Sequence, residues 1–202
     1  MWHYANDIYI ISARMVLTAS FVDKMNFKFH KFSEATALAT KSRWEEVIEQ
    51  QGMFNLDYKR VLDDLSTHID YATAGQGEYR SYGIFGNGDS HASAVVSIVY
   101  TPKPRVARGW LKMLEVKLSP DYDEGIIMDD LGKLGEAIEI YAAAIFGTLS
   151  LRDVHRANVV KLYGRSSALL KFLVAVGTAL KAKNLPNVEV SNEGRWLVIS
   201  KS

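Results

Sequence analysis

The chain has 202 residues and a mass of 22.6 kDa, enough for one domain with a substantial core and short for two. Apolar residues make up 48% and charged residues 23%, with 4 prolines, so a collagen-like, rod-like or wholly disordered chain is excluded. The 24 basic and 23 acidic residues leave a net charge of +1. This balance gives no overall attraction to nucleic acid or to an anionic membrane, and we expect neither partner.

The sequence contains no cysteine, which excludes a disulfide framework, a thiolate metal site and a cysteine nucleophile. A cysteine-free chain is compatible with a reducing compartment, and we expect a cytoplasmic location. The histidines are too scattered for the usual ligand spacings, so we expect no metal. They are His3, His30, His68, His91 and His155.

Residues 1–24 contain two short apolar runs, at 8–11 and 15–17, neither of which is long enough to cross a bilayer. The stretch lacks the basic start and unbroken apolar centre of a signal peptide. We therefore expect an N-terminal extension packed on a single domain formed by residues 25–202.

From residue 25 onward the hydrophobic periodicity alternates between strand and helix patterns. The turn signals at 86–89 and 102–105 are short and predict an antiparallel meander. The expected elements are a strand at 27–30, helices at 34–50 and 55–69, strands at 79–85, 92–100 and 109–118, a long helix at 126–146, a strand at 159–163, a helix at 166–183, and a hairpin at 188–200 turning at 192–194.

The strand at 109–118, the long helix and the strand at 159–163 form a βαβ-type unit, whose two strands should be parallel. The predicted fold class is α/β (α+β), with a mixed, mostly antiparallel sheet and helices on both faces.

Two stretches carry a family resemblance. The first, Leu114-Glu115-Val116-Lys117-Leu118-Ser119-Pro120-Asp121-Tyr122, is similar to the V-x-P-x-Y-like lead-in to the phosphate loop of the GNAT superfamily of N-acetyltransferases. The second, Phe172-Leu173-Val174-Ala175-Val176-Gly177-Thr178, lies where family members end their last major helix with F-Y-x-x-x-G-F, and Ser166 replaces the family's Asn. With the element order, these stretches make the chain from residue 25 resemble that superfamily.

The resemblance implies a GNAT-like fold that binds acetyl coenzyme A between the fourth and fifth core strands and transfers the acetyl group to an amine on a small molecule or protein. The loop departs from the family pattern, because it keeps Gly125 alone and has Asp123 where a basic residue is usual. Leu173 stands where the family has its proton-donating Tyr. The coenzyme-binding residues that the resemblance implies are Leu118, Tyr122, Gly125, Ile126, Arg165, Ser166 and Ser167.

Two residues are candidates for catalysis. Glu115 is the expected general base, because some family members carry their catalytic carboxylate on the same strand; the alternative is an ordinary solvent-facing acid. Tyr163 is the expected proton donor, and its alternative is a strand-end aromatic packed on the sheet. Ser166 and Ser167 are N-cap candidates as well as coenzyme ligands. Arg165 suits a bidentate phosphate contact, or a solvated position.

The leading hypothesis is therefore an N-acyltransferase. The alternative is a GNAT-fold protein without activity that serves as a structural or interaction module, because residues 160–200 also resemble small degenerate members encoded by tailed phages, some carried in the virion. A homodimer could form through the edge strand of the final hairpin, with an exposed Trp196 as a candidate anchor; the alternative for Trp196 is a core position, which is more common for a lone aromatic residue.

Overall fold

The computed structural model describes residues 25–52, 56–67, 72–73, 77–102, 109–123, 126–127, 130–184 and 186–201. The predicted extension at 1–24 lies outside these ranges, so its packing stays a prediction. The elements are β1 (Phe27–Lys31), α3 (Glu34–Gln50), α4 (Leu56–Thr67), β2 (Ala72–Thr73), β3 (Gly77–Gly86), β4 (Ala92–Thr101), β5 (Trp110–Leu118), the 3-10 turn η1 (Pro120–Tyr122), α6 (Leu131–Val154), β6 (Val159–Tyr163), α7 (Ser167–Ala182), β7 (Val188–Glu193) and β8 (Trp196–Lys201).

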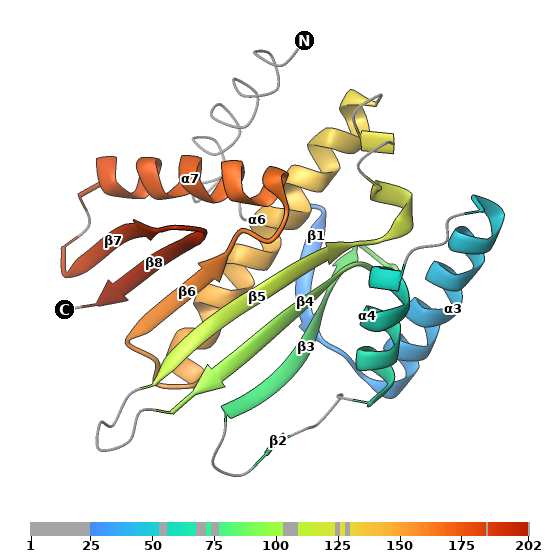
Figure 1. Ribbon diagram of the computed structural model, residues 1–202, viewed down its shortest axis with the longest axis horizontal. Coiled ribbons are helices and arrows are strands. Elements are labelled where there is room, and N and C mark those ends of the chain that lie inside the picture. Colours follow the sequence, from blue (N-terminus) through green and yellow to red (C-terminus); the bar gives the residue numbers. More distant parts are fainter. Residues whose placement is uncertain are drawn as a thin grey trace.

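The strands form one sheet in the order β1-β3-β4-β5-β6-β8-β7, with β2 paired to β3 (Figure 1). Every pair is antiparallel except β5 with β6, which are parallel and are joined through α6. The predicted element order, the parallel unit and the mixed, mostly antiparallel fold class are confirmed.

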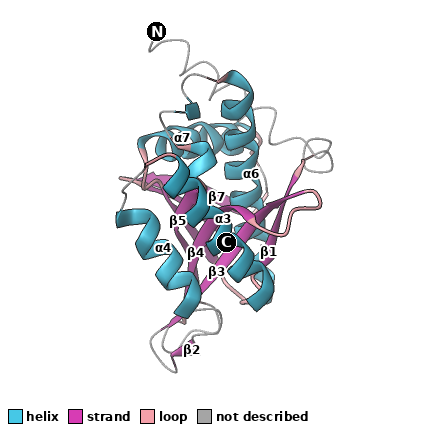
Figure 2. Ribbon diagram, turned by 90° about the vertical axis from the view of Figure 1, so that its right-hand side faces the viewer, coloured by secondary structure: helices cyan, strands magenta, loops and turns pink. Residues whose placement is uncertain are grey.

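Helices cover both faces of the sheet (Figure 2). The larger hydrophobic core lies between the sheet and helices α6 and α7, and a smaller one lies beneath α3 and α4. Strand β4 contributes to both, because Ala94 and Val96 point into the larger core and Val95 into the smaller. Alternation of side chains along a strand explains why this central strand is apolar on both faces.

Helix α3 is attached to the start of β4 by side-chain hydrogen bonds. The indole Nε1 of Trp44 donates to the carbonyl of Ala92 at 2.8 Å, and the amide of Ala92 donates to Thr40 Oγ1 at 2.8 Å. Trp44 is fully buried and packs edge-to-face on Tyr58 of α4, at 6.0 Å between ring centroids. These contacts fix α4 beside the C-terminal half of β5, where the candidate site lies.

The long helix α6 begins later than predicted, at Leu131 rather than at residue 126, and it continues to Val154. The Asp130 carboxylate caps it by accepting from the amides of Gly132 and Lys133. Ile126 and Ile127 form a separate short helical turn, so the apolar pattern at 126–146 had merged two elements. Helix α6 is long and apolar enough to cross a membrane by length and composition, and 61% of its most apolar stretch is buried in the protein.

The final hairpin turns at Gly194–Arg195, slightly later than predicted, and Gly194 has a φ of +61° that suits glycine. The expectation of an exposed Trp196 on the edge strand is wrong. Trp196 lies on β8, which pairs with both β6 and β7, and its half-buried ring lies 4.8 Å from that of Tyr163. The outer strand of the hairpin is β7.

Candidate functional site

The sheet opens between its two parallel strands. Pairing of β5 with β6 runs from Trp110–Val159 to Met113–Leu162 and then stops. Strand β5 continues to Leu118, whereas β6 ends at Tyr163 and the chain turns into α7. The last residues of β5 thus keep their pairing to β4, and no strand among the described residues pairs with them on the other side.

This open edge presents backbone hydrogen-bonding groups. Beyond the end of β5, the amide of Ser119 donates to the carbonyl of Ser93 at 2.8 Å, on the β4 side. Because the N–H and C=O groups of successive residues in a strand point to opposite sides, Val116 and Leu118 direct theirs away from β4. These groups face the gap left by β6.

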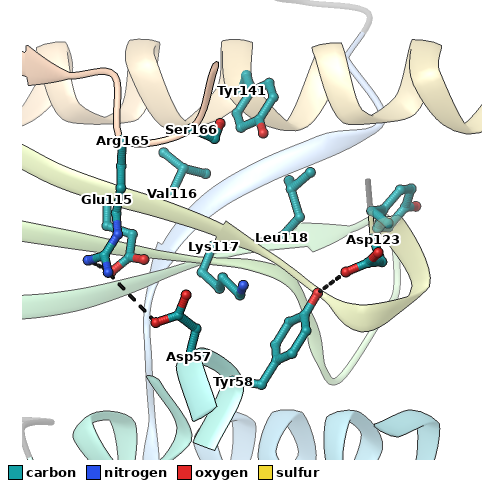
Figure 3. A pocket seen from close by; sticks show the side chains of 11 residues that line it. Asp57, Tyr58, Glu115, Val116, Lys117, Leu118, Asp123, Tyr141, Arg165 and Ser166 are labelled. Atoms are coloured by element: carbon teal, nitrogen blue, oxygen red, sulfur yellow. Dashed lines mark hydrogen bonds and ion pairs between the residues drawn. The ribbon is translucent and has the colours of Figure 1, made fainter. Parts of the chain in front are cut away.

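A cleft of about 420 Å³ lies at this opening (Figure 3). Its walls come from α4, the end of β5, the segment after β5, α6 and the junction of β6 with α7. The lining residues are Asp57, Tyr58, Glu115, Val116, Lys117, Leu118, Tyr122, Asp123, Tyr141, Arg165 and Ser166.

Glu115 lies at one end of the cleft, and its side chain is only 6% exposed. Its Oε2 accepts from Arg60 Nη2 at 2.8 Å and from Arg165 Nη1 at 3.1 Å. The alternative of an ordinary solvent-facing acid is therefore wrong. An irregularity in the β4–β5 register places Met113 in the core of the opposite face and leaves Glu115 beside the arginines.

The two arginines extend this contact into a wider network. Arg60 Nη1 lies 3.5 Å from Asp64 Oδ2 on α4, and Arg165 Nη2 lies 3.8 Å from Asp57 Oδ1. The hydrogen bond to Glu115 raises the pKa of Arg60. Opposite charges thus hold α4 against β5 and against the start of α7, across one end of the cleft.

Tyr58 forms the middle of the α4 wall. It is 2% exposed, and its hydroxyl donates to Asp123 Oδ2 at 3.4 Å. Burial, and then the neighbouring Asp123 carboxylate, raise the pKa of the Tyr58 phenol, which stays protonated at neutral pH. Lys117 Nζ lies over the ring of Tyr58, 4.0 Å from its centroid.

Tyr122 lies in the segment after β5, and its hydroxyl donates to Glu136 Oε2 at 2.7 Å. Burial and this carboxylate raise the pKa of Tyr122. The neighbouring Asp121 is bound by basic groups, since its carboxylate lies 3.4 Å from Arg43 Nη2 and its carbonyl accepts from Lys133 Nζ at 2.9 Å. Basic residues of α3 and α6 therefore compensate part of the acidic loop.

The junction of β6 with α7 has a fixed shape. The carbonyl of Gly164 accepts from the guanidinium of Arg195 in the final hairpin, and a Cβ at residue 164 would lie 2.7 Å from Leu170 Cα. Ser166 caps α7 by accepting from the amide of Leu169 at 3.1 Å, so the N-cap prediction is confirmed for this serine. The capped helix start faces the cleft.

The structure brings five of the predicted site residues together and leaves three elsewhere. Tyr163 does not line the cleft, because its ring packs on Trp196 and lies 5.8 Å from the guanidinium carbon of Arg195. Ile126 and Ser167 are also absent from the lining, and Gly125 lies outside the described residues. The five that line the cleft are Glu115, Leu118, Tyr122, Arg165 and Ser166.

Sequence reasoning missed the contribution of α4 and α6. Asp57, Tyr58 and Arg60 belong to an amphipathic helix whose polar side chains carry no motif. Tyr141 lies within the apolar run of α6 and resembles any core aromatic. The sequence did offer a signal for Lys117, because this residue is two positions from Glu115 on the same strand.

Within the described ranges, no group of three or more His, Asp or Glu side chains could hold a metal ion. Comparison of the sequence with family models and with curated proteins finds no match. A solved structure of a protein assigned to the GNAT family of acetyltransferases, from Desulfovibrio desulfuricans, is similar with a TM-score of 0.41 and 12% identity, over 87% of this chain and 96% of that one. At this degree of similarity, function has to be inferred from the residues of the chain itself.

Proposed function

We propose that the protein transfers an acyl group from a thioester carrier, acetyl coenzyme A, to an amine. The observation that carries this proposal is the unpaired end of β5 inside the cleft between two parallel strands. An extended chain with amide groups can add to such an edge through backbone hydrogen bonds, and the pantetheine arm of coenzyme A is a chain of that kind.

The cleft supplies polar groups to the carrier. Arg165 is 47% exposed, and because its Nη1 lies 3.1 Å from Glu115 it would meet the carrier at the end where Glu115 acts, whereas Asp57 and Asp123 disfavour a diphosphate close to them. Ser166, at the start of α7, offers a hydroxyl beside the pantetheine path. Leu118 and Val116 contribute the strand edge.

The reaction requires that the amine nitrogen attack the thioester carbonyl, that the C–S bond break, and that the thiolate take up a proton. Glu115 could act as the base only through Oε1, because Oε2 already accepts from two guanidinium groups. Tyr141 enters the cleft from α6 and is better placed than Tyr163 to donate the proton (Figure 3).

The same ion pairs favour a second candidate, an interaction protein that shares this architecture and has no transferase activity. A carboxylate bound by two arginines is a typical structural group, and it is poorly suited to abstract a proton. In this case the network would hold α4 on the sheet, and the cleft would bind no thioester.

Calorimetric titration with acetyl coenzyme A, coenzyme A and ADP tests the first step. The expected result is binding of both coenzymes, weakened at least fivefold by Arg165→Ala and unchanged by Lys171→Ala, an exposed position on α7. Thiol release in the presence of amines then tests transfer, and the absence of cysteine removes any background from the protein. Lack of coenzyme binding by folded protein would contradict the proposal and favour the interaction protein.

A further inference from the structure

The cleft already contains an ammonium group that belongs to the protein. Lys117 is half-buried, and its Nζ lies 4.0 Å from the centroid of the Tyr58 ring (Figure 3). A cation at this distance over an aromatic face is attracted by the ring quadrupole. One point in the cleft therefore holds a primary ammonium ion, that of Lys117.

The aromatic face is rigid. Tyr58 is held by its edge-to-face contact with the fully buried Trp44 and by its hydrogen bond to Asp123. Asp57, the preceding residue on α4, places a 56% exposed carboxylate on the same wall. The contacts of the Tyr58 ring with Trp44 and of its hydroxyl with Asp123 do not involve Lys117, and the Asp57 carboxylate lies 3.8 Å from Arg165 Nη2.

We infer that the Tyr58 face is the subsite for the primary ammonium group of the acceptor, in a cleft that Asp57 and Asp123 make acidic, and that Lys117 fills this subsite in the free protein. The inference rests on the proposed function, because only in a transferase is the bound ammonium compound the acceptor. The substrate class is an alkylammonium compound or a lysine side chain. The flexible side chain of Lys117 can leave the ring when such a ligand binds, and its charge then opposes that binding.

The same strand provides a matched control. Lys112 Nζ lies 5.3 Å from the centroid of the Trp110 ring, a contact of the same kind, and neither residue lines the cleft. Replacement of either lysine by methionine keeps an unbranched apolar side chain, one atom shorter, and removes the charge. Lys161 Nζ also lies over the Trp110 ring, 4.8 Å from its centroid, so the variants differ in whether the ring faces the cleft and in whether a cation stays over the ring.

The experiment is a calorimetric titration with 1,4-diaminobutane, with n-butanol as the uncharged probe. Lys117→Met is expected to bind the diamine about fivefold more tightly than the unmodified chain, because the internal competitor and its like charge are gone. Lys112→Met is expected to leave the affinity unchanged, and n-butanol is expected not to distinguish the variants. Diamine binding to Lys117→Met that is equal or weaker would overturn the inference.

A second variant pair separates the ring from general charge effects. In the Lys117→Met background, Tyr58→Leu should remove the gain, and Asp57→Asn should weaken diamine binding about threefold. If Tyr58→Leu does not unfold cooperatively, the result with Asp57→Asn decides the question, because the Asp57 side chain is exposed and its replacement should not disturb the fold. An unchanged diamine affinity of the Asp57→Asn variant would contradict the subsite.

Titration of the same variants with coenzyme A separates the two proposals. Gain of diamine binding without coenzyme binding would support the ammonium subsite and contradict acyl transfer. Coenzyme binding without the gain would leave the transferase proposal standing and overturn the subsite.

Discussion

The ion pairs of Glu115 predict an asymmetry in stability. Glu115 is nearly buried, with a side chain 6% exposed, whereas Arg60 and Arg165 are 41% and 47% exposed. Removal of the carboxylate leaves two cations that can turn toward solvent, Asp64 and Asp57. Removal of both cations leaves a buried negative charge with neither of its arginine partners, which is the costlier state.

The expected magnitudes follow from these exposures. Glu115→Gln keeps an acceptor of the same shape and should lower the free energy of unfolding by about 1–2 kcal/mol. The double variant Arg60→Met, Arg165→Met should lower it by about 3–5 kcal/mol, the range for breaking a buried pair from one side. Addition of Glu115→Gln to the double variant should restore part of the loss, because it removes the uncompensated charge.

Urea unfolding followed by tryptophan fluorescence at neutral pH measures all four proteins, with Arg152→Met as the control. Arg152 pairs with Asp153, which is 88% exposed, so its loss should cost under about 0.5 kcal/mol. If Glu115→Gln costs as much as the double variant, or if the triple variant is no more stable than the double, the arginines do not compensate a buried charge and the reasoning is wrong.

Three further predictions concern the attachment of α3, the packing of α6 and the protonation of Tyr58. Thr40→Val should cost about 1–3 kcal/mol in urea unfolding, because the buried amide of Ala92 loses its acceptor; a cost near zero would show that another group accepts from it. Gly147→Ala should cost a similar ~1–3 kcal/mol, because the added methyl meets the Phe29 ring where β1 crosses α6; unchanged stability would mean that β1 moves away freely. Burial raises the pKa of Tyr58 above its ordinary value of 10, so the stability from its protonated hydroxyl is complete below pH 10 and is lost as the pH rises toward the raised pKa. In Tyr58→Phe the decline in unfolding free energy above pH 10 should therefore be shallower, by up to about 1.4 kcal/mol per pH unit, and equal slopes would contradict this cause.

Several of the site residues that the sequence predicted lie close to a change of element. Ser166 is recognisable because a serine before an amphipathic run is a typical N-cap, and the structure places its hydroxyl on the amide of Leu169. Arg165 and Leu118 lie at strand ends next to such signals. Tyr163 also lies at a strand end, yet its ring packs on Trp196 and not in the cleft. Trp196 belongs to β8, and the pairing of β6 with β8 brings the two rings together.

The sequence by itself determined the order of strands and helices, the antiparallel meander, the parallel βαβ unit and the fold class, because hydrophobic period, caps and turns act over a few residues. It could not determine that Arg60 on α4 and Arg165 after β6 meet on one oxygen of Glu115. Those contacts span 55 and 50 residues of sequence, and they depend on a register irregularity that turns Glu115 away from Met113. Only the tertiary structure decided them, because charge pairing depends on distances that no local pattern records.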